Sequence, residues 1–162
     1  MKKGSSRRLM KTVRNKTAFE AALHLIAYRA QSEWEIRTKL RHKGYREEEI
    51  GSAVERLYRS GYLNDEELAA EIFESYRADG LYGDRYIHQK LKMRGLACAC
   101  HLTAEEELHK ARAAFARKSA VMPGLAADYK KAAGFLMRRG FSASAAAAVW
   151  EDMGHASTDG TE

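Results

Sequence analysis

The chain has 162 residues, a single proline, two cysteines and a formal net charge of +6 at pH 7. This length suits one ordinary domain or a short array of small units, and the scarcity of proline favours long helices over a loop-rich β fold. No apolar run approaches the ~18 residues of a membrane span, and none follows the basic N-terminus as it would in a secretory signal. The two cysteines are too close together for a disulfide framework. Together these features predict a cytoplasmic protein.

The first predicted unit covers residues 17–63 and follows a basic, aperiodic tail, residues 1–16, that we expect to be disordered. Its first two helices begin at capping-box patterns, in which a Ser or Thr precedes a Glu by three residues, at Thr17 and Ser32. Three consecutive glutamates open a third helix at residues 47–49, because acidic side chains suit the positive end of the helix dipole. The unit closes at a turn formed by Gly61, Tyr62 and Leu63.

The helical pattern restarts twice more, which predicts a second unit over residues 64–108 and a third over residues 109–153. Asn64 begins the first helix of the second unit, two glycines then interrupt the chain, and Asp84 is placed to cap the next helix. Thr103 begins a further helix with another capping-box pattern, and a Pro-Gly pair ends that helix.

One six-residue phrase occurs three times, as LRHKGY at residues 40–45, LKMRGL at 91–96 and LMRRGF at 136–141. In each copy we expect the leucine to pack inward, the glycine to turn the chain and the last apolar residue to pack back on its unit. Apolar residues follow the glycine at +6, +10 and +13 in the first and third copies. The middle copy has His101 and Glu105 at the first two of these places, so its third helix is either short or merged into one helix over about residues 104–117.

These repeats predict an all-α protein of three tandem three-helix units, with residues 154–162 as a disordered C-terminal tail. Neighbouring units of such an array are expected to stack. The residues expected to maintain the repeat are the leucines and glycines of the three phrases, the turn that closes the first unit and the tryptophan of the last helix: Leu40, Gly44, Gly61, Tyr62, Leu63, Leu91, Gly95, Leu136, Gly140 and Trp150.

Four stretches of the chain resemble, in order and spacing, the RecX regulatory proteins of bacteria. They are SEWEIRTKL (32–40), GYLND (61–65), YRADGLYGDRYIHQKLKMRGL (76–96) and FLMRRGF (135–141). The resemblance implies an elongated, curved, monomeric molecule that is not an enzyme. It also implies a partner, because RecX proteins lie in the helical groove of the RecA–single-stranded DNA filament. There they block filament extension and suppress ATPase activity and strand exchange, as regulators of DNA repair, recombination and the SOS response.

Basic residues recur on the middle helix and glycine corner of every predicted unit, where few acidic residues offset them. Stacked units would align these residues into a stripe that follows phosphates or an acidic protein groove. The alternative is that Lys and Arg near helix C-termini simply complement the helix dipole. The predicted partner-binding residues are Lys39, Lys43, Arg77, Arg85, Lys90, Lys92, Arg94, Lys130, Lys131, Arg138 and Arg139.

The sequence shows no motif for catalysis or for a bound cofactor. It lacks the GxxxxGK[S/T] phosphate loop, the GxSxG elbow and the HExxH pair, so we expect neither enzyme activity nor a cofactor. Cys98, Cys100 and His101, with His109 eight residues further on, are poorly spaced to hold one structural zinc ion, and no metal site is predicted. His24 is interpreted as a helix-surface residue.

Two other functions remain open from the residues alone. The first is a sequence-independent single-stranded DNA-binding module, in which Tyr82 and Tyr86 stack on bases and the basic tail contacts phosphates. Tyrosines of this kind more often pack half-buried between helices. The second is a generic helical-repeat scaffold that affects neither RecA nor DNA. Filter binding to single-stranded DNA without RecA separates these alternatives.

Overall fold

The computed structural model describes residues 16–154, and within this range all regular secondary structure is helical. The elements are α1 (Ala18–Tyr28), α2 (Glu33–His42), α3 (Glu47–Arg59), α4 (Asp65–Asp79), α5 (Asp84–Met93), α6 (Ala104–Val121), the short 3₁₀ helix η1 (Pro123–Leu125), α7 (Tyr129–Arg138) and α8 (Ala143–Asp152). The predicted all-α fold is confirmed. The two predicted tails lie outside the described residues, apart from Lys16 and Gly154.

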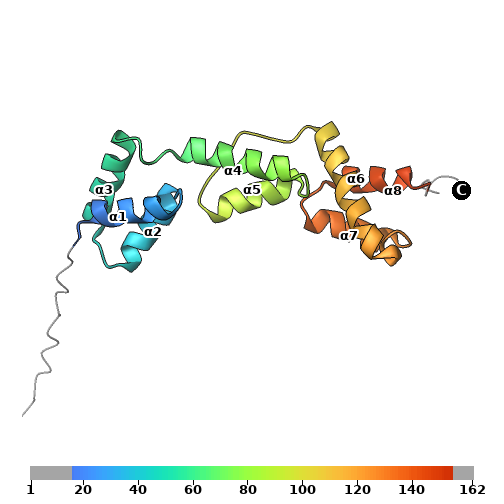
Figure 1. Cartoon of the computed structure of the whole chain (residues 1–162), viewed down its shortest axis with the longest axis horizontal. Helices are drawn as coiled ribbons and strands as arrows, with labels where there is room; N and C mark the ends of the chain where they lie inside the picture. Colours follow the sequence, from blue (N-terminus) through green and yellow to red (C-terminus); the bar gives the residue numbers. More distant parts are fainter. Residues whose placement is uncertain (1–15, 155–162) are drawn as a thin grey trace, which may run out of the picture.

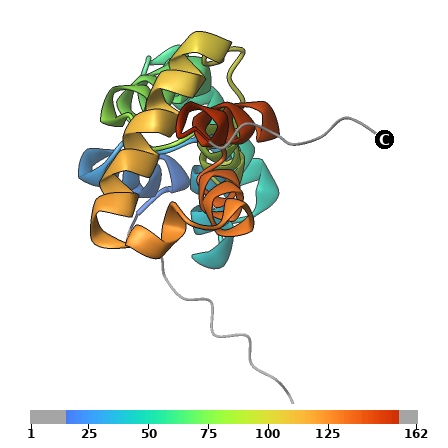
Figure 2. The same ribbon diagram turned by 90° about the vertical axis from the view of Figure 1, so that its right-hand side faces the viewer.

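The molecule is elongated, and its helices fall into three groups along the long axis (Figure 1). Helices α1, α2 and α3 form one end, α4 and α5 the middle, and α6, α7 and α8 the other end. Seen from that last end, α6 crosses in front of the molecule with α7 and α8 beside it (Figure 2). None of the helices in residues 16–154 combines the length and apolar character that a membrane span needs.

The predicted capping boxes begin three of the helices. At Thr17, Ser32 and Thr103 the side-chain oxygen accepts from the amide three residues on, while that residue's glutamate accepts from the capping amide. Asn64 also caps α4 as predicted. The predicted cap at Asp84 is wrong, because Gly83 is the N-cap of α5 and the Asp84 carboxylate accepts from the Leu102 amide instead, at 2.8 Å.

Three separate hydrophobic clusters hold the described part of the chain together. The first joins α1, α2 and α3 around residues such as Ile36, Leu40 and Leu57, which are fully buried. The third joins α6, α7 and α8 around Leu136 and Phe141. Each buried aliphatic or aromatic side chain contributes roughly 1.5–3 kcal/mol, so these clusters supply the main stabilisation within each helix group.

The middle cluster is built differently from its two neighbours. Its buried residues come from α4, α5 and the start of the following segment, and partly buried Cys98, Cys100 and Leu102 complete it. Residues 96–103 are therefore packed, non-helical chain in the place where the outer clusters have a helix. The predicted boundary between residues 108 and 109 falls inside α6, whose Ala111 and Phe115 belong to the third cluster. The division into three repeat units stays a proposal.

The repeated glycine phrase forms the contact between the first and middle helix groups. Gly95 has φ +71° and lies against Trp34 near the start of α2, so close that an added Cβ would be 2.4 Å from the Trp34 Cβ. The Ser32 hydroxyl donates to the Arg94 carbonyl, at 2.5 Å. The Arg94 side chain donates to the Glu35 carboxylate at 2.9 Å and to the Ala30 carbonyl at 2.8 Å. We name this contact the first junction.

The next copy of the phrase makes the same kind of contact with the middle group, at the second junction. The Gly83 amide donates to the Arg139 carbonyl at 2.8 Å, and the Arg85 amide donates to the Gly140 carbonyl at 3.2 Å. An added Cβ on Gly140, which has φ +83°, would be 2.2 Å from the Tyr86 nitrogen. The Arg139 guanidinium donates to the backbone carbonyl of Leu81, just before α5, at 3.2 Å.

Both junctions join equivalent positions of the repeat. The N-caps of α2, α5 and α7 are Ser32, Gly83 and Asp128, and each lies twelve residues before its phrase glycine. In each junction the corner that ends one middle helix docks on the start of the preceding middle helix. The phrase is thus repeated because it is the docking corner as well as a helix end. The first copy is the exception among the described residues, since a Cβ added to Gly44 would meet no atom within 4 Å.

Candidate partner-binding surface

Four of the eleven predicted basic residues are engaged inside the molecule. The Lys39 ammonium donates to the Gln31 side chain at 2.6 Å. Arg77 donates through Nε to Glu106 at 2.9 Å, and so ties α4 to α6. Arg94 and Arg139 stabilise the first and second junctions. Because each of these four side chains already donates to another group of this chain, we interpret them as structural, and their contact with a partner stays a prediction.

The junction arginine Arg94 also sets the electrostatics of its neighbour Glu35. Burial alone would raise the pKa of Glu35, but hydrogen bonds from Arg94, the Ser32 amide and Arg29 lower that pKa to about 2. The Glu35 side chain is only 9% exposed, so this carboxylate is a buried anion held between two guanidinium groups. The first junction therefore depends on an ionised Glu35.

Five of the eleven basic residues are exposed and make no hydrogen bond or ion pair with another side chain among residues 16–154. They are Lys43, Arg85, Lys92, Lys130 and Arg138. The remaining two are weakly engaged. Lys131 lies 3.7 Å from Asp128 with both side chains largely in solvent, and the Lys90 ammonium lies 5.0 Å from the centre of the Tyr86 ring. The exposed Lys131–Asp128 pair contributes little to stability, and half-buried Lys90 makes only this ring contact among the contacts described, so neither ammonium is firmly held.

Two neighbouring hollows gather most of these accessible cations around α7. One has a volume of about 590 Å³ and is lined by Met122, Pro123, Gly124, Leu125, Lys130, Lys131 and Arg138. The other, of about 260 Å³, lies at the second junction and is lined by Arg85, Tyr86, Gln89, Met137, Arg138 and Gly140. Arg138 lines both hollows, and no acidic residue lines either one. We name Arg85, Lys130, Lys131 and Arg138 the basic surface.

The basic surface combines positive charge with exposed apolar groups. Met122 and Met137 line its two hollows and are 49% and 45% exposed. A surface that presents cations beside apolar groups can bind an acidic protein surface, or a phosphate backbone with adjoining apolar groups. Lys43 and Lys92 are exposed but do not line these hollows, so the hollows gather only part of the predicted stripe, which stays a prediction.

The tyrosines of the single-stranded DNA alternative pack on one another. Tyr82 and Tyr86 are stacked with ring centres 4.2 Å apart, and both meet Tyr76 edge-on. All three are half-buried. A ring already stacked on another ring has only part of its surface left for a base, which weakens the case for base stacking at this position.

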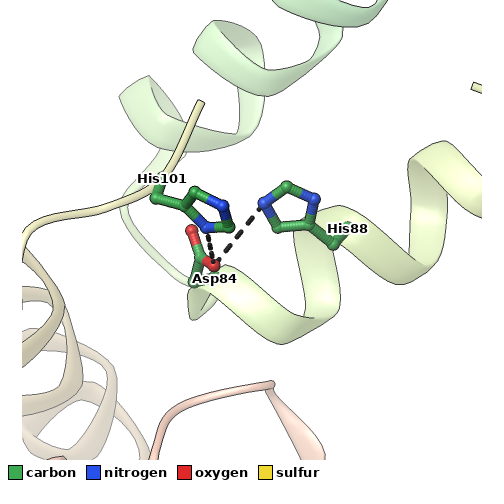
Figure 3. Close-up of side chains that lie close together, drawn as sticks. All are labelled: Asp84, His88 and His101. Carbon is green, nitrogen blue, oxygen red and sulfur yellow. Dashed lines mark hydrogen bonds and ion pairs between the residues drawn. The ribbon is translucent and has the colours of Figure 1, made fainter. Parts of the chain in front are cut away.

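One cluster of potential ligands was missed in the sequence, although part of its pattern was readable. Asp84 and His88 are one helical turn apart on α5, and His101 reaches them from the segment before α6 (Figure 3). The i, i+4 pairing of Asp and His was a usable signal. The position of His101 was not, because it depends on the path of the non-helical segment.

Comparison with known proteins identifies relatives over most of the chain. Residues 18–57 match the family described as RecX, first three-helix domain. A regulatory protein RecX of Trichlorobacter lovleyi is 34% identical over 131 residues, which cover 75% of this chain and 85% of the relative. A regulatory protein RecX of Actinobacillus pleuropneumoniae is 38% identical over 82 residues, or 51% of this chain and 54% of that relative.

A solved structure shares the fold. The crystal structure of RecX from Lactobacillus salivarius superimposes with a TM-score of 0.68 at 17% sequence identity, and covers 85% of this chain and 94% of that one. At this level of identity the likeness concerns the arrangement of helices. It supports the elongated, all-helical architecture seen here.

Proposed function

The chain belongs to the RecX family of regulatory proteins, and on this basis we propose that it regulates the RecA recombinase by binding the RecA–single-stranded DNA filament. Binding would block extension of the filament and lower its ATPase and strand-exchange activities. The protein acts in this proposal as a monomeric binding module with no catalytic step of its own.

The observation that carries the proposal is the basic surface. Four cations from α5 and α7 line two hollows that share Arg138, and no acidic residue lines either one. A filament groove bounded by recombinase subunits and DNA offers acidic side chains and phosphates together, which is the complement of this surface. An elongated molecule can follow such a groove over several subunits (Figure 1).

The internal and the exposed cations have different roles in this mechanism. The internal arginines Arg94 and Arg139 keep the helix groups in register, so that the basic surface is presented in one geometry. The exposed cations make the contacts with the filament. Because these contacts are exposed and charged, binding should weaken as the salt concentration rises.

A sedimentation experiment tests the proposal against its alternatives. The full chain is incubated with preformed RecA–single-stranded DNA filaments, with RecA alone or with DNA alone, and each mixture is centrifuged. We expect the chain to pellet with the filament at salt concentrations where it stays soluble with DNA alone. Equal retention on bare DNA would favour the single-stranded DNA-binding module, and no retention in any mixture would favour a scaffold unrelated to RecA.

A further inference from the structure

Three side chains that can bind a metal ion converge beside α5. Asp84 Oδ2 lies 2.8 Å from His101 Nδ1 and 3.5 Å from His88 Nε2. One ligand atom from each of the three residues lies within 4.8 Å of the others. The three side chains point toward a common centre from the first turn of α5, its second turn and the following segment (Figure 3).

Neighbouring contacts orient this group. The second carboxylate oxygen of Asp84 accepts from the Leu102 amide at 2.8 Å, which directs the other oxygen at the histidines. The His88 ring lies against Phe73, with ring centres 5.9 Å apart, and 4.6 Å from the His101 ring. Supporting contacts of this kind hold metal ligands in place before the ion arrives.

The ligand types and spacing fit a borderline transition-metal ion. Two imidazoles and one carboxylate are a common zinc ligand set, whereas Mg²⁺ and Ca²⁺ favour oxygen ligands alone. Ligand atoms about 2.0–2.1 Å from a tetrahedral zinc ion are roughly 3.4 Å apart. The Asp84–His88 separation of 3.5 Å is already close to this value, and the Asp84–His101 pair must open slightly from its hydrogen-bonded 2.8 Å.

We propose that Asp84, His88 and His101 form a binding site for Zn²⁺ or a similar divalent transition metal, with water completing the coordination. His88 Nε2 would exchange its present contact with the Cys100 carbonyl, at 3.0 Å, for the metal. The ion would fix the non-helical segment to α5, at the position where the middle cluster lacks a third helix. Its effect is structural: it joins the middle cluster to the segment that leads into α6.

The nearby cysteines offer a rival site that an experiment must exclude. Cys98 and Cys100 are free thiols close to His101 in sequence, and the Cys100 amide donates to the Cys98 sulfur at 3.2 Å. Neither cysteine belongs to the group of converging ligands. A double Cys98→Ala/Cys100→Ala variant therefore separates the two possibilities.

The test is metal titration of the full, tag-free, metal-free chain, read by thermal unfolding and, with Co²⁺, by visible absorption. We expect Zn²⁺ to raise the thermal midpoint of the native chain and of the double cysteine variant, whereas Mg²⁺ should not. His88→Ala and His101→Ala should each lose the Zn²⁺-dependent shift. His109→Ala is the matched control, an exposed histidine on α6, and should keep it.

Folding of the variants is checked without metal. The His101 side chain is 65% exposed, so His101→Ala should match the midpoint of the native chain when no metal is added. The proposal is overturned if Zn²⁺ fails to shift the native chain, if both histidine variants keep the shift, or if the double cysteine variant loses it. A thiolate-to-cobalt absorption band in the native chain would also contradict it.

Discussion

Replacing Gly140 by Ala tests whether the repeated phrase is a docking corner. Gly140 has φ +83°, and an added Cβ would lie 2.2 Å from the Tyr86 nitrogen and 2.5 Å from the Tyr86 Cβ. These are atoms of a helix start rather than the end of a flexible side chain, so they cannot move aside alone. Gly44 is the matched control, because it has φ +80° but no atom within 4 Å of the added Cβ.

The two substitutions share one energetic term and differ in another. A left-handed conformation costs an alanine roughly 1–2 kcal/mol relative to glycine, and this is the whole expected effect of Gly44→Ala. Gly140→Ala adds either overpacking of about 1–3 kcal/mol or separation of the second junction. Separation would break the hydrogen bonds from the Gly83 and Arg85 amides, each contributing about 1 kcal/mol. We therefore expect a total loss of about 3 kcal/mol for Gly140→Ala.

Urea unfolding followed by circular dichroism measures both losses under the same conditions. The expected result is that Gly140→Ala lowers the free energy of unfolding by about twice as much as Gly44→Ala. Losses of equal size would show that only the backbone conformation matters at these glycines. An unchanged free energy of unfolding for Gly140→Ala would contradict the second junction itself.

Three further predictions concern charge. First, the pKa of Glu35 is lowered from 4.5 to about 2 in the folded chain, so its contribution to the free energy of unfolding is complete above pH 4.5 and is lost as the pH falls toward 2. Unfolding measured against pH should show this loss in the native chain and a smaller loss in Glu35→Gln. Second, Arg94→Met should lower the free energy of unfolding in urea by about 1–3 kcal/mol. Lys92→Met, at an exposed position, should change it by no more than about 0.5 kcal/mol. Equal effects would show that Arg94 does not stabilise the first junction. Third, the double variant Lys130→Glu/Arg138→Glu should weaken the inhibition of RecA ATPase without losing helix content. Arg117→Glu, at an exposed position on α6, should leave the inhibition unchanged. Full inhibition by the folded double variant would show that the basic surface does not contribute to the mechanism.

The helices were predictable because their signals are local. A capping box lies within four residues, and a positive-φ glycine ends its own helix, so Thr17, Ser32 and Gly95 could be interpreted from the sequence alone. The middle group was also partly predictable, since His101 and Glu105 stand six and ten residues after Gly95, where the other two copies have apolar residues, and so interrupt the apolar stripe of a third helix. The observed α6 begins at Ala104, as the merged-helix alternative expected.

The roles of the arginines could not be derived in the same way. Arg94 and Ser32 are 62 residues apart in the chain, and only the docked junction brings them together. In the sequence, Arg94 is one more basic residue near a helix C-terminus and is indistinguishable from Lys92 beside it. The Asp84–His101 contact could not be derived from the sequence either, because it spans 17 residues and depends on the path of a non-helical segment.

Inhibition of RecA by this chain is tested most directly by the rate of ATP hydrolysis by RecA on single-stranded DNA. Cognate RecA filaments are preformed, and the hydrolysis rate is measured as the full chain is added at low and at high salt. We predict that the hydrolysis rate falls with increasing chain concentration, and that it falls less at high salt. A rate that stays constant at every chain concentration and both salt conditions would contradict it.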